Sequence, residues 1–523
     1  MRQNYLKNAA LLTGSNLLLR LAGMAFRIYL ANALGDEGLG LYQLILAFYS
    51  VFITLATSGV SVAATRLVTE ELSKSLAQAR GMIRHLAAAA LGLGCTAGAV
   101  QYALADAAAR WWLGDLRAAA SLRTLAFSLP FMALAAVLRG AFVALRRVEP
   151  NVISQMVEQG FRISVVLVLL QRWAGPDIAG RCNAVLLGET LSEALSTGLM
   201  LLFYRGECRR SLRADRPRRP AQAARRIWEI LWPVEGGRCL SSGLRTAENM
   251  LVPACLSVYL GQEGGGRTEA LAQYGTLKGM AMPLLSFPFS LLNSLATLLM
   301  PEITEAHIHG RRETLCALLD RMITLTMYAS VAAAAVFYMW AEPLAQLLYR
   351  STETGFYIRV LAPIMPLMYL ESMVDGAIKG LGEQKAAFGY TAWDSVLRIA
   401  GVIGLLPRCG MQGFLLVMIL SNLFTCMMNA RRLILVTGLR VQAVRWFLAP
   451  CAAAAPAALA ARWMQTALAG WPLPARLLAG CAVMALAYLA AAWPLGLGQA
   501  VAGALRRPGR KGKPAGPDRT QKI

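Results

Sequence analysis

The segment NLLLRLAGMAFRIYLANALG, residues 16–35, is apolar enough to cross a membrane, yet it carries Arg20 and Arg27. A charged side chain at bilayer depth is costly, so it usually faces a cavity or another helix, and a functional role is the first hypothesis for it. The segment therefore raises two questions: whether the chain spans a membrane, and what the two arginines meet.

The composition answers the first question. The chain has 523 residues, of which 57% are hydrophobic and 15% are charged, whereas soluble domains carry about 25% charged residues. Apolar stretches long enough to span a bilayer recur along the chain. We therefore predict an all-α polytopic membrane protein with about fourteen transmembrane helices. Prolines in the apolar segments 228–258 and 272–300 predict kinks or breaks there.

The charge balance, 52 basic to 29 acidic residues, would suggest nucleic acid in a soluble protein. In a membrane protein, Lys and Arg collect in cytoplasmic loops and lie against anionic lipids of the inner leaflet. Placing both termini in the cytoplasm puts most of the basic loop residues on that side. We therefore expect membrane lipids, and no nucleic acid, as partners.

Cysteine and histidine patterns give no sign of a bound group. The ten cysteines are scattered without a Cys-x-x-Cys pair, and the three histidines lack the spacing of a zinc site. The sequence predicts no metal site and no cofactor. It also lacks G-x-S-x-G, Walker motifs and a large outer domain, so we expect a transporter and not an enzyme.

The two halves of the chain resemble each other. Each has a basic–glycine pair and, on the next span, an acid and an arginine four residues apart: Arg139–Gly140 with Glu158 and Arg162, and Lys379–Gly380 with Asp394 and Arg398. Both halves begin and end in the cytoplasm, so they form parallel repeats. Transporters of that design place the substrate path between the halves.

These patterns predict five parts of the chain. In order they are an N-terminal six-helix lobe (1–204), an Arg-rich cytoplasmic linker (205–226), a C-terminal six-helix lobe (227–432), two additional transmembrane helices (433–500) and a basic disordered tail (501–523). The two lobes are expected to surround a central cavity by pseudo-symmetry.

The first span answers the second question with two alternatives. Arg20, Gly23 and Arg27 lie at i, i+3 and i+7, so both guanidinium groups project from one helix face, about 10 Å apart along the axis. Two guanidinium groups on one helix face suit a di-anion such as a pyrophosphate, because each can donate two parallel hydrogen bonds to phosphate oxygens. Alternatively, the arginines pair with acids on neighbouring spans or on the opposite lobe.

Other ionisable residues fall within spans. Glu158–Arg162 and Asp394–Arg398 are each expected to neutralise each other within one helix. Glu189 and Glu193 have no basic neighbour on their own span, which leaves a proton or cation site open. The remaining candidates, which face either a cavity or an interface, are Arg245, Lys278 and Asp375.

With these segments in hand, the chain resembles the stage V sporulation protein B-like branch of the polysaccharide flippases. That branch belongs to the multidrug/oligosaccharidyl-lipid/polysaccharide (MOP) transporter superfamily. The resemblance rests on NLLLRLAGMAFRIYLANALGDEGLGLYQLI (16–45), LATSGVSVAATRLVTE (55–70), YGTLKGMAMPLLSFPFSLLNSLATLLMPEITEA (274–306), IKGLGEQKAAF (378–388) and DSVLRIAG (394–401).

The resemblance implies a monomeric protein of the bacterial plasma membrane. It would flip an undecaprenyl-pyrophosphate-linked sugar from the inner to the outer leaflet, with the pyrophosphate held by Arg20, Arg27, Lys278 and Arg245. The lipid tail would follow a groove near the last two spans. Two alternatives remain, a cation-coupled multidrug exporter that depends on Glu189 or Glu193, and a sugar-polymerising membrane enzyme. The cousin lipid II flippases space their first-helix arginines one residue closer, which leaves the equivalence of Arg27 open.

Overall fold

The computed structural model describes residues 2–173, 175, 177–210, 222–262 and 264–505, and every regular element within these ranges is helical. The all-α prediction is confirmed. Half of the predicted linker, 211–221, and most of the predicted tail, 506–523, lie outside the described residues.

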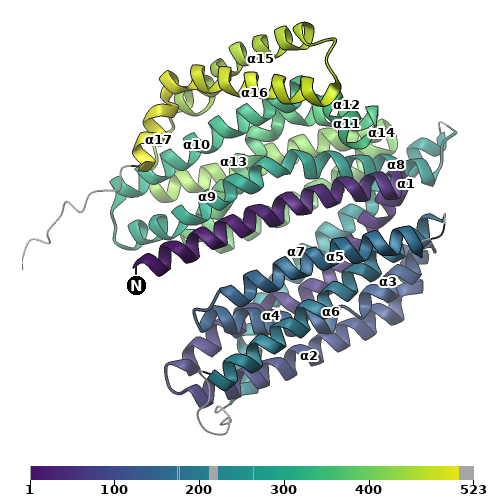
Figure 1. Ribbon diagram of the computed structural model, residues 1–523, viewed down its shortest axis with the longest axis vertical. Helices are drawn as coiled ribbons and strands as arrows, with labels where there is room; N and C mark the ends of the chain where they lie inside the picture. The colour runs from purple at the N-terminus through teal and green to yellow at the C-terminus, as the bar shows by residue number, and fades with distance from the viewer. Residues whose placement is uncertain (1, 174, 176, 211–221, 263, 506–523) are drawn as a thin grey trace, which may run out of the picture. The chain divides into compact units, whose positions relative to one another are not determined.

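The helices run the length of the described chain (Figure 1). Those of the first half are α1 (Arg2–Leu72), α2 (Leu76–Ala107), α3 (Ala118–Ala126), α4 (Leu129–Ala144), α5 (Glu149–Arg172) and α6 (Ile178–Arg210). The second half contains α7 (Ala223–Gln262), α8 (Arg267–Gly275), α9 (Met282–Ile308), α10 (Arg312–Met339), α11 (Ala341–Tyr349), α12 (Thr352–Leu361), α13 (Met365–Gly380), α14 (Gln384–Thr437), α15 (Ala449–Ala467), α16 (Leu473–Ala492) and α17 (Gly498–Leu505).

Short turns of other helical types join some of these elements. Four are π-helical, η1 (Ala108–Trp112), η2 (Thr276–Ala281), η4 (Val444–Leu448) and η5 (Trp493–Leu497), and one, η3 (Ala362–Ile364), is a 3-10 turn. The turn η2 matters most below, because it carries a basic residue into a pocket.

The length and apolarity of the helices confirm a multi-pass membrane protein. Within the described ranges, nine helices are long and apolar enough to cross a membrane, or ten if α3 and α4, bent by 40°, form one span. Three of the nine contain a break, at Gly35 in α1 (φ 72°), at Gly410 in α14 (φ 57°) and at Gly496 between α16 and α17 (φ 126°), where glycine adopts a positive φ at little cost. The total of fourteen spans stays a prediction.

The chain forms two compact units. Unit 1 comprises Met1–Ser294, Glu342–Leu361 and Gln384–Met428, and unit 2 comprises Leu295–Ala341, Ala362–Glu383 and Asn429–Ile523. The boundaries of the two predicted six-helix lobes stay a prediction.

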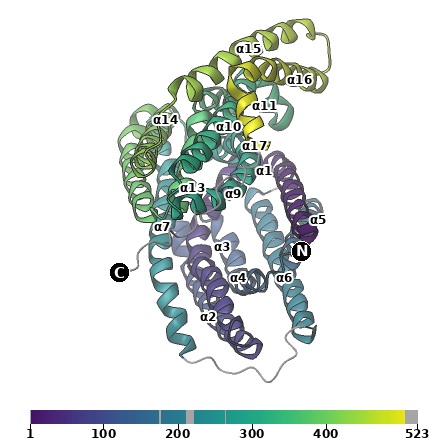
Figure 2. The ribbon, with the colours of Figure 1, turned by 90° about the vertical axis from the view of Figure 1, so that its left-hand side faces the viewer.

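In unit 1, α1 is the central element, because it packs against α2, α4, α7 and α8. The helices α2, α3 and α4 lie side by side (Figure 2). The interior is filled by large apolar side chains, among them Phe48 and Phe142, each 1% exposed. Phe142 packs on Leu138 and on Met200 of α6.

A close crossing of α1 and α8 follows the bend at Gly35. A Cβ atom at Gly40 would collide with the backbone oxygen of Leu271, and one at Gly275 would collide with the backbone of Asp36 and Gly40. The two backbones touch because both positions lack a side chain, the device by which membrane helices approach most closely.

In unit 2, the last two long helices pack on each other and on α10 (Figure 1). Gly480 of α16 lies directly under the indole of Trp340, which is fully buried. At the entry to α15, Arg445 and Trp446 both bond to Asp320 of α10, at 2.9 and 2.8 Å. These contacts fix the C-terminal helices to the rest of the unit.

Candidate functional site

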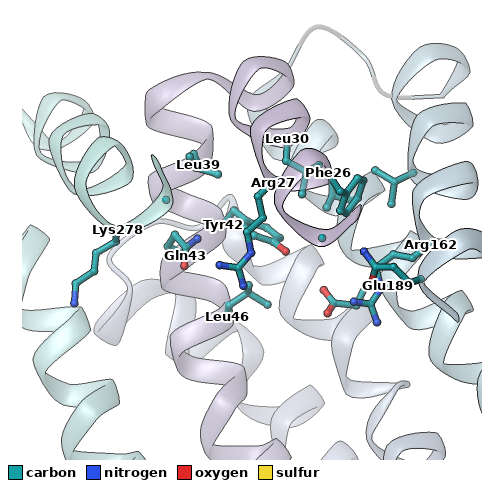
Figure 3. Close-up of a pocket in the computed structure, with 15 residues that line it drawn as sticks. Phe26, Arg27, Leu30, Leu39, Tyr42, Gln43, Leu46, Arg162, Glu189 and Lys278 are labelled. Atoms are coloured by element: carbon teal, nitrogen blue, oxygen red, sulfur yellow. The ribbon is translucent and has the colours of Figure 1, made fainter. Parts of the chain in front are cut away.

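Unit 1 contains a polar pocket of about 300 Å³, which we call the arginine pocket. Its walls come from α1, α5, α6 and η2, and Figure 3 shows its side chains. The polar residues among its lining are Arg27, Tyr42, Gln43, Gln159, Arg162, Glu189 and Lys278. Polar and charged groups gathered at bilayer depth make this pocket the leading candidate for a substrate site.

A second cavity of about 430 Å³, the side pocket, shares three lining residues with the first: Gly23, Arg27 and Lys278. It continues along α1 to Arg20, and its opposite wall is the first part of α9, including Ser286 and Phe287. The two cavities therefore form one path along α1, from Tyr42 back toward the start of the chain.

The two arginines of the first span lie on this path, and both line the side pocket. Arg27 is exposed within it, while Nη1 of Arg20 is buried and has no hydrogen-bond partner among the described residues. Gly23 between them lies near Gln159 of α5, whose amide nitrogen would be 3.9 Å from a Cβ atom there. The spacing of Arg20 and Arg27 predicted that they share one face of the first span, and in the structure that face of α1 forms one wall of the side pocket.

Lys278 contributes a third cation from another element. It sits in the π-helical turn η2, a geometry that often marks functional sites. Its ammonium lies 5.6 Å from the ring centroid of Phe414, which offers a cation–π contact. In the view of Figure 3, Lys278 and the Arg162–Glu189 pair lie on opposite sides of Arg27.

Behind the pocket lies a network that we call the charge cluster, consisting of Arg139, Glu158, Arg162, Glu189 and Glu193. Glu158 accepts from Arg139 at 2.9 Å and from Arg162 at 2.7 Å, so the predicted pair within α5 is formed. Arg162 also lies 3.6 Å from Glu193 of α6. The cluster therefore shares Arg162 with the pocket.

The equivalent residues of the second half take different partners. Arg398 of α14 pairs with Glu248 of α7, and Asp394 accepts a hydrogen bond from Ser421 at 2.5 Å. The prediction that Asp394 and Arg398 pair with each other is wrong. The physical reason is that Glu248, whose side chain is 6% exposed, needs a cation of its own.

Two further candidates lie away from both pockets. Arg245 is an exposed residue of α7 and is not part of either lining. Asp375 belongs to unit 2, where Lys379 donates to it at 2.5 Å. A substrate role for Arg245 and an ion-coupling role for Asp375 stay predictions.

Ion pairs hold both ends of the second segment of α1. After the bend, Glu37 accepts from Arg117 at 2.7 Å, and Arg117 also donates to Asp115. Burial alone would raise the pKa of Asp115, but hydrogen bonds from the side chain and backbone of Arg117 outweigh it and hold the pKa below its usual value. At the other end of α1, Arg226 of α7 bonds to Glu70 and Glu71.

Sequence reasoning missed several pocket residues. Tyr42 lies seven residues beyond the bend at Gly35, and its place in the lining became clear only from that bend in α1. Gln43 and Gln159 carry no sequence signal, because an uncharged amide in a span is unremarkable. Arg139 was predicted only as the basic residue of a basic–glycine pair, yet it reaches from α4 to Glu158 of α5.

Comparison with known proteins gives concordant matches. The profile of a family described as "Polysaccharide biosynthesis protein" matches residues 5–223. The chain is 24% identical to stage V sporulation protein B of Bacillus subtilis (strain 168) over 437 residues, which cover 82% of this chain and 83% of that protein. It is 23% identical to sporulation protein YkvU of the same organism over 399 residues, or 74% of this chain and 85% of that one.

Solved structures share the fold. The lipid II flippase MurJ in an inward closed conformation matches with a TM-score of 0.69 at 12% identity, covering 94% of this chain and 99% of that one. An inward-facing multidrug resistance MATE family transporter of the MOP superfamily matches with a TM-score of 0.65 at 15% identity, covering 82% and 100%. At such identities the likeness concerns the fold alone.

Proposed function

We propose that this chain, a homologue of the polysaccharide biosynthesis proteins within the MOP superfamily, flips an undecaprenyl-pyrophosphate-linked oligosaccharide from the inner to the outer leaflet. The family and the membrane fold support a flippase of polysaccharide biosynthesis. The lipid carrier, the direction and the absence of any catalytic step are our proposals.

One observation carries the choice of substrate. Arg20, Arg27 and Lys278 line the joined pockets, and none of the three forms an ion pair with a described acidic residue. A cation at bilayer depth that lacks an ion-pair partner is costly, which favours a site that receives negative charge from a ligand. A pyrophosphate carries that charge in a shape that two arginine forks bind bidentately.

The geometry also supports a path for the lipid. The crossing of Gly40 with Leu271 and Gly275 closes the end of the arginine pocket nearest the bend, while the side pocket continues toward Arg20. With both termini in the cytoplasm, the open end faces the inner leaflet, where the precursor is made. The apolar wall formed by Met24, Met282 and Phe287 suits the first units of a prenyl tail.

Transport then requires the crossing to open and the other end to close. Binding of the head group neutralises the three cations, which otherwise repel one another at bilayer depth. This reduction in electrostatic repulsion occurs only when the substrate is bound. We propose that it favours the rearrangement that exposes the pocket to the outer side.

The multidrug-exporter alternative is not favoured by the site. Such a transporter needs carboxylates that are free to meet a cation, and here the nearest acids, Glu189 and Glu193, face Arg162. The remaining pocket charges are positive. A cationic drug would be repelled by Arg27 and Lys278 before reaching either acid.

Ligand competition separates the two functions. The purified protein is immobilised in lipid nanodiscs and offered farnesyl-pyrophosphoryl-N-acetylglucosamine, a short analogue of the precursor, or ethidium, a cationic dye. We expect saturable binding of the analogue that survives excess ethidium. Saturable binding of ethidium, with none of the analogue, would overturn the proposal.

A further inference from the structure

The acids of the charge cluster face guanidinium groups from three helices. The acids are Glu158, Glu189 and Glu193, and the guanidinium groups facing them are Arg139 of α4, Arg162 of α5 and Arg27 of α1. The other titratable groups near the two α6 carboxyls are the hydroxyls of Tyr42 and Tyr49 on α1, which are neutral at ordinary pH. Arg162 and Arg27 therefore connect the acids of the charge cluster with the arginine pocket, which also holds Lys278.

Glu193 forms only a long ion pair with Arg162. Its side chain is 8% exposed, its nearer oxygen lies 3.6 Å from Arg162, and its other oxygen, Oε2, is buried without a hydrogen-bond partner among the described residues. The hydroxyl of Ser196, three residues further along α6, bonds to the hydroxyl of Ser154 at 2.8 Å, and neither hydroxyl bonds to Oε2 of Glu193. An orphan carboxylate oxygen in such a place is costly, and a proton on it removes the charge.

Arg162 links this carboxyl to the pocket. It lines the arginine pocket, pairs with Glu158 at 2.7 Å and faces Glu193. Any anion that enters beside Arg27 draws on the positive charge of both arginines. The negative charge of that anion then makes a charged carboxylate at Glu193 more costly, because less of the positive charge of Arg162 is left to offset it.

We propose that binding of an anionic head group in the arginine pocket is coupled to the uptake of one proton by Glu193. The proton comes from water and forms an O–H bond at Oε2, and no bond of the ligand is broken. This inference rests on the proposed function, because it takes the head group as the anion. It also gives the acids of the charge cluster a role, because the proton taken up by Glu193 reduces the net negative charge that crosses the bilayer with the substrate.

The chemistry of the cluster fits a proton better than a metal cation. Na⁺ requires several oxygen ligands around one point, and here two guanidinium groups occupy the space between the carboxylates. A proton needs only the one oxygen that lacks a partner. Loss of the carboxylate charge also frees Arg162 to turn its donors to the ligand.

Linkage gives the sign of the effect. If anion binding takes up a proton, then protons strengthen anion binding by the same coupling free energy. The affinity for the head group should therefore fall as pH rises, by up to about tenfold per pH unit in the steepest region. A probe whose own charge is constant is needed to see this.

The experiment uses farnesyl-pyrophosphoryl-N-acetylglucosamine, because a pyrophosphate esterified at both ends does not titrate near neutral pH. Binding to the full-length protein in nanodiscs is measured by calorimetry from pH 5 to 9, and proton uptake is measured with an indicator dye in weak buffer. We expect uptake of about one proton per bound probe and the stated fall in affinity. In Glu193→Gln, which mimics the protonated acid, both effects should vanish while binding remains.

Controls separate the possible failures. Glu207→Gln, a buried carboxylate on the same helix paired with Arg147 at 2.6 Å, should keep the wild-type pH dependence. Wild-type binding without proton uptake, or uptake replaced by a need for Na⁺, would overturn the inference and leave the flippase proposal intact. No binding of the probe at any pH would overturn both. If Glu193→Gln fails to fold, Glu193→Asp takes its place and should shift the pH midpoint.

Discussion

Arg20 and Arg27 both line a cavity, and neither forms an ion pair with a described acidic residue. Guanidinium groups without an ion-pair partner can bind an anion, and their coplanar N–H donors favour a phosphate, which accepts two parallel hydrogen bonds. Lys278 opposes them with a point charge held beside Phe414. At the scale of single residues, the proposed site is an anion receptor made from three cations on two elements.

Replacing Arg27 with alanine should weaken binding of farnesyl-pyrophosphoryl-N-acetylglucosamine about 10- to 100-fold, the value of a charge-assisted hydrogen bond. Arg27→Lys should restore only part of the affinity, because a lysine keeps the charge and loses the fork. Calorimetry in nanodiscs measures both. Arg359→Ala, which removes an exposed partner of Glu342, should bind like wild type.

The pair formed by Glu248 and Arg398 makes a prediction about stability. Arg398→Leu leaves a buried carboxylate without a cation and should lower the free energy of unfolding by about 3–5 kcal/mol. The double variant Glu248→Leu/Arg398→Leu should recover much of that loss, because no charge remains buried. Thermal unfolding of the detergent-solubilised protein gives the comparison.

A matched control for that cycle is Arg225→Leu, which breaks an exposed pair with Glu229 and should have little effect. If Arg398→Leu is as stable as wild type, Glu248 does not depend on this partner.

The partners of charged residues could be predicted only when they lay on one helix. The pair of Glu158 and Arg162 is fixed by helical spacing, so the sequence predicts it correctly. Arg398 has the same spacing to Asp394, yet it pairs with Glu248, 150 residues earlier. Spacing does not reveal which acid arrives from another helix, and therefore the second prediction was wrong.

Among the elements, α1 determines the pocket because it changes direction at Gly35. The residues before the bend supply the arginines, and those after it supply Tyr42, Gln43 and the crossing with α8. The sequence predicted two apolar segments here but not their angle. Prolines predicted kinks or breaks in 228–258 and 272–300. The helix α7 continues through the first segment, while the second contains the π-helical turn η2.

The crossing predicts a transport defect. In Gly275→Leu, a side chain would occupy the space taken by the backbone of Asp36 and Gly40, so α1 and α8 must separate. We expect flipping to fall by at least about tenfold, because overpacking of this size costs more than 1.4 kcal/mol. The measurement is the rate of lipid movement in proteoliposomes.

The matched change for that experiment is Gly261→Leu at the end of α7, where a Cβ meets nothing within 4 Å, and it should transport normally. Normal transport by Gly275→Leu would show that the crossing is not part of the transport cycle.

The C-terminal helices give a second prediction at this scale. Gly480→Leu would force α16 away from the buried indole of Trp340 and should lower the free energy of unfolding by about 1–3 kcal/mol. A lower melting temperature would report it. Gly404→Leu in α14, which faces open space, should be neutral or slightly stabilising, and an equal loss in both variants would contradict the packing argument.

At the scale of the whole molecule, the sequence predicted the class of the protein and its family but less of its architecture. Apolar stretches and charge composition were enough for an all-α membrane protein, since both follow from the bilayer. The number of spans and the limits of the lobes depend on where long helices bend and which helices pack together. Those contacts join distant residues, and local periodicity does not contain them.

Orientation can be tested directly. Alkaline phosphatase, which is active only outside the cytoplasm, should be active when fused after residue 175, between α5 and α6, and inactive when fused after residue 222, at the start of α7. A green fluorescent protein fused to either terminus should fluoresce. The opposite pattern would place the side pocket on the outer face and reverse the proposed direction.

The central claim is that an arginine-lined pocket carries the head group of a lipid-linked sugar across the membrane. The measurement is the movement of a fluorescent undecaprenyl-pyrophosphate-linked sugar between leaflets of proteoliposomes, detected by quenching from outside. Wild-type protein should accelerate this movement, and Arg20→Ala/Arg27→Ala, correctly folded by its melting curve, should reduce it to the rate of empty liposomes. Undiminished flipping by the double variant would contradict the claim.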